Sequence, residues 1–381
     1  MRRNKVFGAG VAVLALSLSM TACGSDDGGD GDSDAKGSVC GKNIAFLGAL
    51  TGDAGALGQN MLNGVKLALD EYNKDNADCK IGVKQFDSQG SPDKAPGLAT
   101  QIINDDSIVG LVGPGFSGES LATGKTFYEA GLPSISPSAT NVTITDQGWI
   151  TWHRVIGNDS AQGAADAKYL TETAGAKKVF VVDDGQDYSK GLAGYVKDGL
   201  GDAAAGDDQI SVGQTDMSAV VTQIKAADAD AVFYAGYYAE AGLLAKQLRQ
   251  SGFKGTFMSG DGSQDPAFVK AAGAQGAEGA VLSAPAAPAP PDFNDRVKAA
   301  TGSDAGLYST QAYDATNIFL AAFEDGKTSP KDINDFIGSY EGDGASGPIS
   351  FDDKGDIKTS TIYAYFVKNG VMDVENPEAI K

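Results

Sequence analysis

A glycine-rich turn at residues 113–118, "GPGFSG", is the first stretch whose residue types favour ligand binding. It matches the G-x-G-x-x-G pattern of dinucleotide sites. Such a site requires the pattern in the first strand–helix turn of a domain, with an acidic residue about 20 positions later. Here the pattern follows the third strand-like run, and "LPSISPSAT" occupies the later position. The spacing therefore argues against a nucleotide.

The same turn suits a small anion such as a carboxylate. A glycine-rich turn that opens a helix exposes backbone N–H groups at the positive end of the helix dipole. Ser117 adds a hydroxyl group to these donors. The alternative for this loop is a plain tight turn.

Residues that usually carry catalysis are sparse in this chain. His153 is the one histidine and lies in the strand-like stretch "TWHRV", where a structural role is the more common one. The sequence contains no HExxH, CxxC or GxSxG motif. We therefore predict that the protein is not an enzyme and uses neither a metal nor a cofactor. The spacing leaves open an enzyme built from carboxylates alone.

The start of the chain has the order of a secretory signal. A basic beginning is followed by an uncharged stretch of 15 residues and by small residues before Cys23. A stable membrane span needs about 20 apolar residues, so this stretch is short for one. The tetrapeptide "MTAC" resembles the bacterial lipobox, in which the cysteine is lipidated, although Met20 replaces the usual Leu, Val or Ile. We predict a signal peptide at 1–22 and an anchor to the outer face of the cell membrane through Cys23.

Residues 23–40 are predicted to be a flexible acidic tether, because they contain almost no apolar side chain. Three aspartates at 30, 32 and 34 have the spacing that begins an EF-hand loop. Ala35 stands where that loop needs glycine, and Gly41 stands where it needs glutamate, so calcium is not predicted.

Charge limits the partners of the remaining body. The formal net charge is -20, and residues 1–22 carry three positive and no negative charges, so their removal leaves -23. A surface this acidic does not attract nucleic acid phosphates or anionic lipids. Outside the cytoplasm, Cys40 and Cys79 are expected to form a disulfide, with two buried thiols as the alternative.

Short apolar runs alternate with amphipathic helical segments along the rest of the chain, which indicates parallel sheets covered on both faces. About 340 residues are too many for one compact core, so two lobes are expected. The predicted strands of the first half are 44–50, 81–87, 108–115 and 133–140, and those of the second half are 177–184, 231–238, 255–262 and 279–286. Residues 347–367 are predicted to form a hairpin with its turn at "DKGD".

Seven stretches occur in the order of one known family. They are "IAFLGALTGDAGALGQNMLNGVKLALDEYN", "LVGPGFSGESLA", "PSISPSATN", "HRVIGNDSAQG", "DDGQDYSKGLA", "SAVVTQIKAADADAVFYAGYYAEAG" and "FMSGDG". With them, residues 42–370 resemble the leucine/isoleucine/valine-binding proteins of bacterial ABC importers, which have the type I periplasmic binding-protein fold. The resemblance implies an α/β protein with two doubly wound parallel-sheet lobes joined by a three-crossing hinge.

The resemblance also implies a ligand site between the lobes. Ser117 matches the serine that holds the α-carboxylate of the ligand, and Asp261 matches the acid that pairs with its ammonium group. The other positions implied to bind the ligand are Leu57, Ser138, Ala139, Thr140, Asp159, Tyr188, Tyr237 and Tyr308. A buried carboxylate or ammonium needs a partner, because enclosing either charge alone costs several kcal/mol. Hydroxyl and amide donors on one wall and one acid on the other meet this need.

We therefore expect a receptor that closes on an amino acid, most readily a branched-chain one, and delivers it to a permease partnered by a cytoplasmic ATPase. Lobe 1 is predicted at 41–157 plus 284–347, and lobe 2 at 158–283 plus 348–381. A monomer is expected. The rivals are the same fold with a short amide, urea or an aromatic acid, a sensory receptor without transport, and an extracellular hydrolase.

Overall fold

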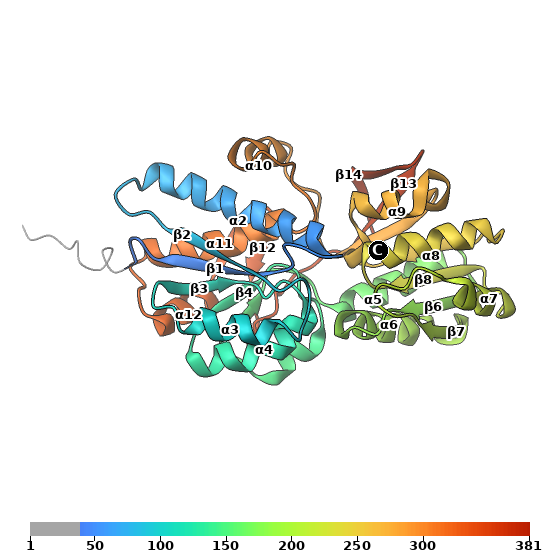
Figure 1. Cartoon of the computed structure of the whole chain (residues 1–381), viewed down its shortest axis with the longest axis horizontal. Coiled ribbons are helices and arrows are strands. Elements are labelled where there is room, and N and C mark those ends of the chain that lie inside the picture. Colours follow the sequence, from blue (N-terminus) through green and yellow to red (C-terminus); the bar gives the residue numbers. More distant parts are fainter. Residues whose placement is uncertain (1–38) are drawn as a thin grey trace, which may run out of the picture. The chain divides into compact units, whose positions relative to one another are not determined.

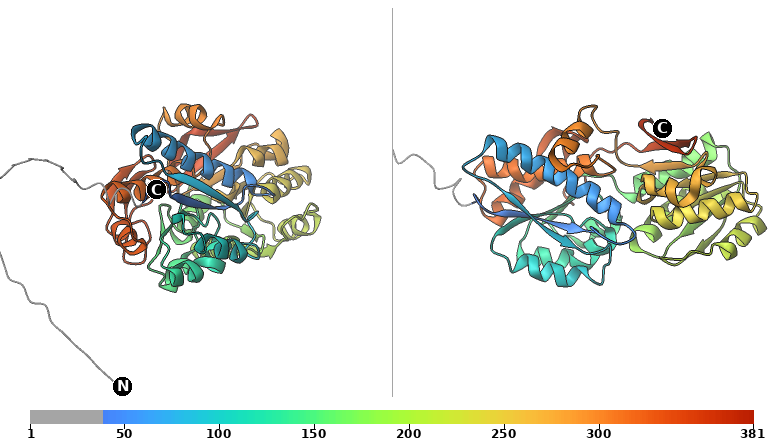
Figure 2. Two further views of the ribbon diagram at one scale, coloured as in Figure 1. Left: turned by 60° about the vertical axis from the view of Figure 1, so that its left-hand side comes forward. Right: turned by 45° about the horizontal axis from the view of Figure 1, so that its top comes forward.

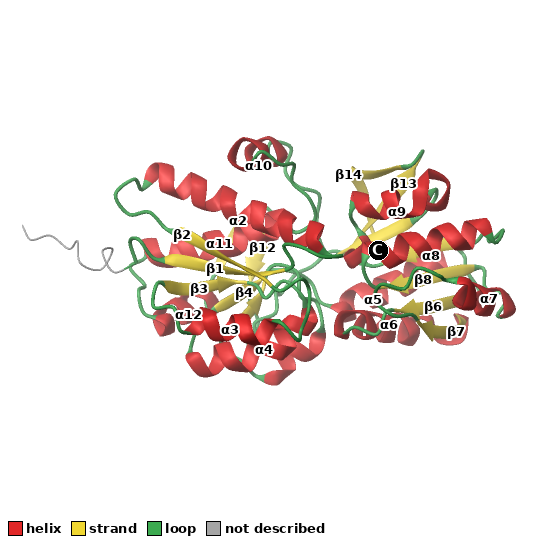
Figure 3. Ribbon diagram, viewed as in Figure 1, coloured by secondary structure: helices red, strands yellow, loops and turns green. Residues whose placement is uncertain are grey.

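Two sheets organise the part of the protein that its computed structural model describes, residues 39–381 (Figure 1). Strands and helices alternate along most of this range, as the sequence predicts (Figure 3). The predicted signal peptide 1–22, the lipidation site Cys23 and residues 23–38 of the predicted tether lie outside the described residues.

The first sheet is entirely parallel and has the strand order β2-β1-β3-β4-β5. Its strands are β1 (Asn43–Gly48), β2 (Gly82–Asp87), β3 (Ile108–Val112), β4 (Ser134–Ser136) and β5 (Trp152–Arg154). Its helices are α2 (Gly55–Asp75), α3 (Ala95–Ile103), α4 (Ser117–Ala130), η1 (Val142–Gln147), α10 (Phe293–Thr301), α11 (Ser309–Glu324) and α12 (Pro330–Gly338).

Both faces of this sheet are buried. Side chains alternate along β1, so Ile44 and Phe46 pack with residues of α2 and α11, whereas Ala45 and Leu47 pack with residues of α3 and α4. Figures 1 and 2 show these two helix layers on opposite sides of the strands. This explains why β1 is an uninterrupted apolar run in the sequence.

The second sheet has the strand order β14-β13-β10-β9-β8-β6-β7, in which β6 to β10 are parallel and the last two strands are antiparallel. Its strands are β6 (Val179–Asp183), β7 (Ala204–Gln209), β8 (Ala231–Ala235), β9 (Thr256–Ser259), β10 (Val281–Ala284), β13 (Tyr363–Lys368) and β14 (Val371–Ala379). Its helices are α5 (Asp159–Lys168), η2 (Tyr169–Thr173), α6 (Asp187–Leu200), η3 (Gly201–Ala203), α7 (Ser218–Ala226), α8 (Tyr238–Gln250), η4 (Asp261–Ser263) and α9 (Pro266–Ala277).

The parallel parts of the two sheets share one topology. In each, the second strand along the chain is the edge strand and the first lies between the second and third, so β2-β1-β3-β4-β5 corresponds to β7-β6-β8-β9-β10. The strand order reverses between β1 and β3 and between β6 and β8. Ligands of such sheets bind beyond the carboxyl ends of the strands at this point. The turns after these four strands are therefore where a site is expected.

Three segments connect the two sheets. The first follows β5, the second follows β10, and the third leads to β13. The predicted hairpin over 347–367 is wrong in its pairing. Instead, β12 (Gly347–Ser350) pairs with β11 (Glu341–Gly344), and only a single bridge, Phe351 with Ile357, closes the predicted turn. The reason is that β13 pairs with β10 and β14 of the second sheet.

His153 has the surroundings of a structural residue. It is buried in β5, and its ring packs edge-on against Phe351 with 5.0 Å between the ring centroids. Burial lowers its pKa to about 4, so the imidazole is neutral near pH 7. This agrees with the structural role predicted for it.

The predicted disulfide between Cys40 and Cys79 is confirmed. It joins the segments that precede the adjacent strands β1 and β2, where the Gly41 N–H also donates to the Lys80 carbonyl. The two cysteines are 39 positions apart. A cross-link over this distance removes unfolded-state entropy worth about 4 kcal/mol in the chain-entropy model.

Replacing both cysteines by alanine is therefore expected to lower the free energy of unfolding by about 3–4 kcal/mol. Urea denaturation of the purified protein measures this. Reduction of the native protein should produce a similar loss and should leave the double variant unchanged. A loss below about 1 kcal/mol in both experiments would contradict the prediction.

Candidate functional site

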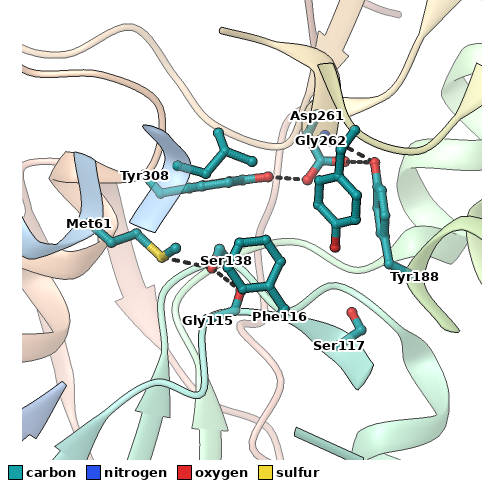
Figure 4. A pocket seen from close by; sticks show the side chains of 11 residues that line it. Met61, Gly115, Phe116, Ser117, Ser138, Tyr188, Asp261, Gly262 and Tyr308 are labelled. Atoms are coloured by element: carbon teal, nitrogen blue, oxygen red, sulfur yellow. Dashed lines mark hydrogen bonds between the residues drawn. The ribbon is translucent and has the colours of Figure 1, made fainter. Parts of the chain in front are cut away.

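A pocket lies between the carboxyl ends of the two sheets, where the shared topology places a ligand site (Figure 4). The cavity left free among its lining residues is about 10 Å³. They are Leu57, Met61, Gly115, Phe116, Ser117, Ser138, Tyr188, Tyr237, Asp261, Gly262 and Tyr308. The N-terminal part of α2, the turns after β3 and β4 and the start of α11 supply one wall, and the turns after β6, β8 and β9 supply the other.

Asp261 is the acidic residue of this pocket and is 1% exposed. It follows β9 in η4. One carboxylate oxygen accepts a hydrogen bond from the Tyr188 hydroxyl at 2.7 Å, and the other accepts one from the Tyr308 hydroxyl. Tyr308 comes from the opposite wall, as Figure 4 shows. Both oxygens of the acid are therefore held by hydroxyl groups that point into the pocket.

The glycine beside Asp261 is required by close packing. A Cβ atom at Gly262 would lie 2.7 Å from the Gly236 carbonyl oxygen and 2.9 Å from the Tyr188 ring. Its N–H group donates to the Tyr188 hydroxyl at 3.1 Å. The glycine thus lets the acid-bearing turn approach the tyrosine that orients the acid.

The electrostatics of the pocket favour a cationic partner for Asp261. Burial raises the pKa of its carboxyl, and hydrogen bonds from Tyr308, Tyr188 and Gln162 oppose the rise by stabilising the ionised form. Arg154 is the single buried Lys or Arg side chain within residues 39–381, and it forms an ion pair with Asp356. A ligand ammonium group would supply the charge that this acid lacks.

Tyr308 has an unusual backbone conformation. Its φ is 68°, in the left-handed region that large side chains seldom adopt, and it is the residue before the first turn of α11. This conformation directs an aromatic ring with a polar tip into the pocket and onto Asp261. Backbone strain of this kind concentrates at functional sites.

Donor groups line the wall opposite Asp261. Ser117 is the first residue of α4, so its hydroxyl lies at the positive end of that helix dipole. The hydroxyl oxygen accepts a hydrogen bond from the Asn141 backbone N–H at 3.3 Å, which leaves its hydrogen for another acceptor. This is the arrangement predicted for a carboxylate.

Glu119 fixes the start of α4. It is fully buried and accepts hydrogen bonds from the Phe116 N–H at 3.3 Å and from the Ser88 hydroxyl. Burial raises its pKa to about 8. Glu119 is therefore neutral near pH 7. Because it carries no negative charge, it does not offset the positive end of the α4 dipole, which faces the pocket at Ser117.

Seven of the ten predicted ligand residues line the pocket: Leu57, Ser117, Ser138, Tyr188, Tyr237, Asp261 and Tyr308. The Ser138 hydroxyl donates to the Gly115 carbonyl at 2.5 Å and contacts the Met61 sulfur. The Tyr237 ring packs against Phe116 and Tyr188, with centroids 5.5 and 5.4 Å apart. Tyr237 therefore joins the two walls.

Ala139, Thr140 and Asp159 are not among the lining residues. The Ala139 carbonyl accepts from Arg154 at 3.0 Å, and the Thr140 carbonyl accepts from the Asp159 N–H at 3.0 Å. Asp159 is fully buried, and burial raises its pKa to about 7. The Thr140 side chain, also buried, opposes this rise by hydrogen bonding to the ionised acid.

Four lining residues were not predicted: Met61, Gly115, Phe116 and Gly262. Gly115 and Phe116 belong to the "GPGFSG" turn, so the sequence contained a signal for them. Met61 lies one helical turn after Leu57 on α2, and i, i+4 positions share a helix face. The same spacing would have identified it.

Each helix within residues 39–381 is too short or too polar to span a bilayer. In the same part of the chain, no group of three or more His, Cys, Asp or Glu side chains is arranged to hold a metal ion.

Comparison with known proteins adds to this geometry. The family model described as "Periplasmic binding protein" matches residues 42–371. The leucine-specific-binding protein of Salmonella typhimurium is 30% identical over 325 residues, which cover 83% of this chain and 88% of that protein. A solved structure of the branched-chain amino acid transporter substrate-binding protein LivJ from Streptococcus pneumoniae, in complex with isoleucine, is 28% identical. It has a TM-score of 0.82 and covers 89% of this chain and 99% of that one. The leucine-binding protein LivK from Thermotoga maritima is also 28% identical, with a TM-score of 0.80 over 88% of this chain and 98% of that one.

Proposed function

The chain belongs to the periplasmic binding protein family, and from this premise we propose that it captures a branched-chain amino acid outside the cytoplasm and delivers it to an ABC permease with a cytoplasmic ATPase. The observation that carries the proposal is the placement of buried Asp261 opposite Ser117 and the start of α4. An amino acid has an ammonium group for the first and a carboxylate for the second.

Apolar and aromatic residues complete the proposed pocket. Leu57, Met61 and Phe116 contribute hydrocarbon surface, which suits the side chain of leucine, isoleucine or valine. The relatives named above are binding proteins for leucine or isoleucine, which supports the same choice here and a binding protein rather than an enzyme.

A thermal-shift screen of the purified protein against all twenty amino acids tests this function. A ligand present at 100 times its Kd should stabilise the protein by about 2.7 kcal/mol. Leucine, isoleucine or valine should produce the largest shifts. Stabilisation by acetamide, urea or benzoate, without any effect of these three amino acids, would favour the rival ligands, which have no ammonium group for Asp261.

In the proposed mechanism, ligand contacts on both walls favour closure of the lobes. Contacts outside the pocket also join the two sides. The Tyr238 hydroxyl oxygen accepts a hydrogen bond from the Ala56 backbone N–H at 3.3 Å. The Asn60 amide donates to Asp265 at 3.3 Å, and the Asn141 amide donates to the Asp187 carbonyl at 2.7 Å.

Replacing Tyr238 by phenylalanine removes one of these contacts and nothing from the pocket. Because one neutral hydrogen bond contributes about 0.5–1.5 kcal/mol, leucine affinity should fall about two- to tenfold, mainly through faster dissociation. Stopped-flow fluorescence measures both rates. An unchanged dissociation rate would show that this contact does not stabilise the liganded form.

The hinge of the proposed receptor consists of the three connecting segments. For two of them we propose the positions of the predicted lobe boundaries, near Gly157 and Ser283. For the third, we propose a position between Ile357 and Tyr363 instead of the predicted boundary near Pro348. The supporting contacts are those of Asp356 with Arg154 of the first sheet, together with the bond from the Arg154 N–H to the Gly355 carbonyl. A Cβ at Gly157 would lie 2.1 Å from the Ser360 hydroxyl oxygen and 3.0 Å from Pro285, so the three segments meet there.

The anchor remains part of the proposal: Cys23 is lipidated and residues 23–40 tether a monomeric body to the membrane. Replacing Cys23 by serine should abolish incorporation of a labelled fatty acid and release the protein from the membrane fraction into the medium. Cys40→Ser with Cys79→Ser is the matched control and should leave the label in place. Fatty-acid labelling that persists in Cys23→Ser would contradict the anchor.

Transport distinguishes the importer from a sensory receptor with the same cleft. Cells that lack this chain should lose uptake of the bound amino acid if the protein serves an importer. A hydrolase would instead show turnover that disappears when a pocket acid is changed.

A further inference from the structure

Three fully buried polar side chains lie behind Asp261, outside the pocket lining. Gln162 and Asp166 are one turn apart on the buried face of α5, and Ser283 is on β10. The Ser283 hydroxyl donates to one oxygen of Asp166 at 2.9 Å. The Gln162 amide nitrogen donates to the Ser283 hydroxyl oxygen at 3.0 Å and approaches its carbonyl at 3.4 Å.

Two atoms of this group have no hydrogen-bond partner among the described residues: the second Asp166 oxygen, Oδ1, and the Gln162 amide oxygen, Oε1. Both atoms are acceptors if Asp166 is ionised. Two buried acceptors without a hydrogen bond destabilise the folded protein, because each has lost its hydrogen bonds to water. A single proton on Oδ1 would give Asp166 a donor for the Gln162 oxygen one turn away. The three side chains would then form a closed ring in which each donates to the next.

Gln162 connects this ring to the ligand site, because its amide group lies beside the residues Gly260 and Asp261. A Cβ at Gly260, the residue before Asp261, would lie 3.3 Å from the Gln162 amide nitrogen. That nitrogen makes its shorter bond to the Ser283 hydroxyl at 3.0 Å and a longer one to the Ser283 carbonyl at 3.4 Å. The Gln162 side chain also hydrogen-bonds Asp261 and lowers the pKa of that acid against the effect of burial. Rotation of the amide by half a turn would instead place its oxygen against the acid.

We propose that Asp166 is a positioning residue for Asp261: as a neutral acid it closes a hydrogen-bonded ring with Gln162 and Ser283, and this ring holds an amide N–H against the carboxylate that meets the ligand ammonium. The inference rests on the proposed function, because it assigns Asp261 to the ammonium group.

The charged surroundings agree with a neutral Asp166. The titratable groups that face it are Asp159 on its own helix, Asp261 on η4 and, from α6, the Tyr188 hydroxyl that donates to Asp261. β10 contributes the Ser283 hydroxyl. Arg154, the one buried cation of the described residues, is paired with Asp356. Burial raises the pKa of Asp166 well above its usual value, and the two neighbouring acids raise it further.

The test compares two replacements of Asp166 in the purified protein, with L-leucine Kd measured by calorimetry from pH 5 to pH 9. Asp166→Asn has the donor and acceptor arrangement of the neutral acid, so its Kd should stay within about twofold of the native value at every pH. Asp166→Leu cannot close the ring. Its Kd should rise about tenfold, and the midpoint of its pH profile should move up by about one unit, because Asp261 loses the amide donor.

Asp314→Asn is the matched control. Asp314 is a buried acid that accepts from the Ser346 hydroxyl at 2.5 Å, away from the pocket, so its replacement should leave the pH profile in place. If Asp166→Leu fails to fold, Ser283→Ala tests the same ring and should move the midpoint in the same direction. A shifted profile in Asp166→Asn, or a native profile in both Asp166→Leu and Ser283→Ala, would overturn the proposal.

A second readout does not depend on a ligand. The infrared difference spectrum of native protein minus Asp166→Asn at pH 7 should contain the carbonyl band of a protonated carboxylic acid. A carboxylate band there would overturn the neutral acid. If the native protein shows the protonated band but does not bind leucine, the ring stands and the proposed function fails.

Discussion

Replacing Asp261 by alanine is expected to weaken L-leucine binding about 200- to 5,000-fold. Removing one partner of a buried ion pair costs about 3–5 kcal/mol, because the other charge is left enclosed without compensation. In the complex that charge is the ligand ammonium. In the unliganded protein, the partners of Asp261 are the Tyr188 and Tyr308 hydroxyls, which carry no charge. The same replacement should therefore destabilise the unliganded protein far less than it destabilises the complex.

Calorimetric titration of the variant with leucine measures this effect. Asp261→Asn retains the shape of the side chain and should lose most of the same affinity, because the charge is what matters. Asp314→Asn removes a buried acid elsewhere and should bind leucine as the native protein does. If Asp261→Ala kept native affinity, the acid would not be the ammonium partner.

Between pH 6.5 and pH 8.5, the unliganded protein should lose at least about 2 kcal/mol of its free energy of unfolding. Burial raises the pKa of Glu119 to about 8, and that of Asp166 well above its usual value. The unfolded chain has released both protons well below pH 6.5, whereas the folded protein still holds them. A folded state that holds more protons becomes less stable as pH rises, and one proton held with a pKa of about 8 corresponds to about 2 kcal/mol over this window. The proton on Asp166 adds to this loss in the same direction.

The window starts at pH 6.5 because His153 acts in the opposite direction below it. Burial lowers the pKa of His153 to about 4, so between pH 4 and pH 6.5 its titration makes the folded protein more stable as pH rises. Urea denaturation at four pH values measures the loss. Glu119→Gln should remove part of it. Stability that is flat or rises from pH 6.5 to pH 8.5 would contradict the buried neutral acids.

Much of the fold could be predicted from local patterns. Strands such as β1 and β8 are buried on both faces and appear in the sequence as continuous apolar runs between helical segments. The disulfide was predicted because an even pair of cysteines is expected to be oxidised outside the cytoplasm. The pairing of residues 347–367 could not be predicted in this way. "DKGD" favours a turn, but the strand after it finds its partners in the second sheet. Long-range pairing of that kind has no local signal.

The candidate site shows the same division. Ser117 could be proposed because it stands in a glycine-rich turn that opens a helical segment, whereas Asp261 was implied by the resemblance to the family. Ala139 and Asp159 are in equally recognisable turns but do not line the pocket. The Ala139 carbonyl accepts from the Arg154 side chain, and the Asp159 N–H donates to the Thr140 carbonyl. The ring of Gln162, Ser283 and Asp166 joins positions 121 and 117 apart in sequence, which no spacing rule connects.

The most direct test of the central claim compares three ligands by calorimetry on the purified protein: L-leucine, the same molecule without its ammonium group (4-methylpentanoate), and the same molecule without its carboxylate (3-methylbutylamine). If Asp261 holds the ammonium and the Ser117 turn holds the carboxylate, leucine should bind and each analogue should bind at least about 100-fold more weakly. Binding of 4-methylpentanoate as tightly as leucine would show that the protein does not recognise the zwitterion.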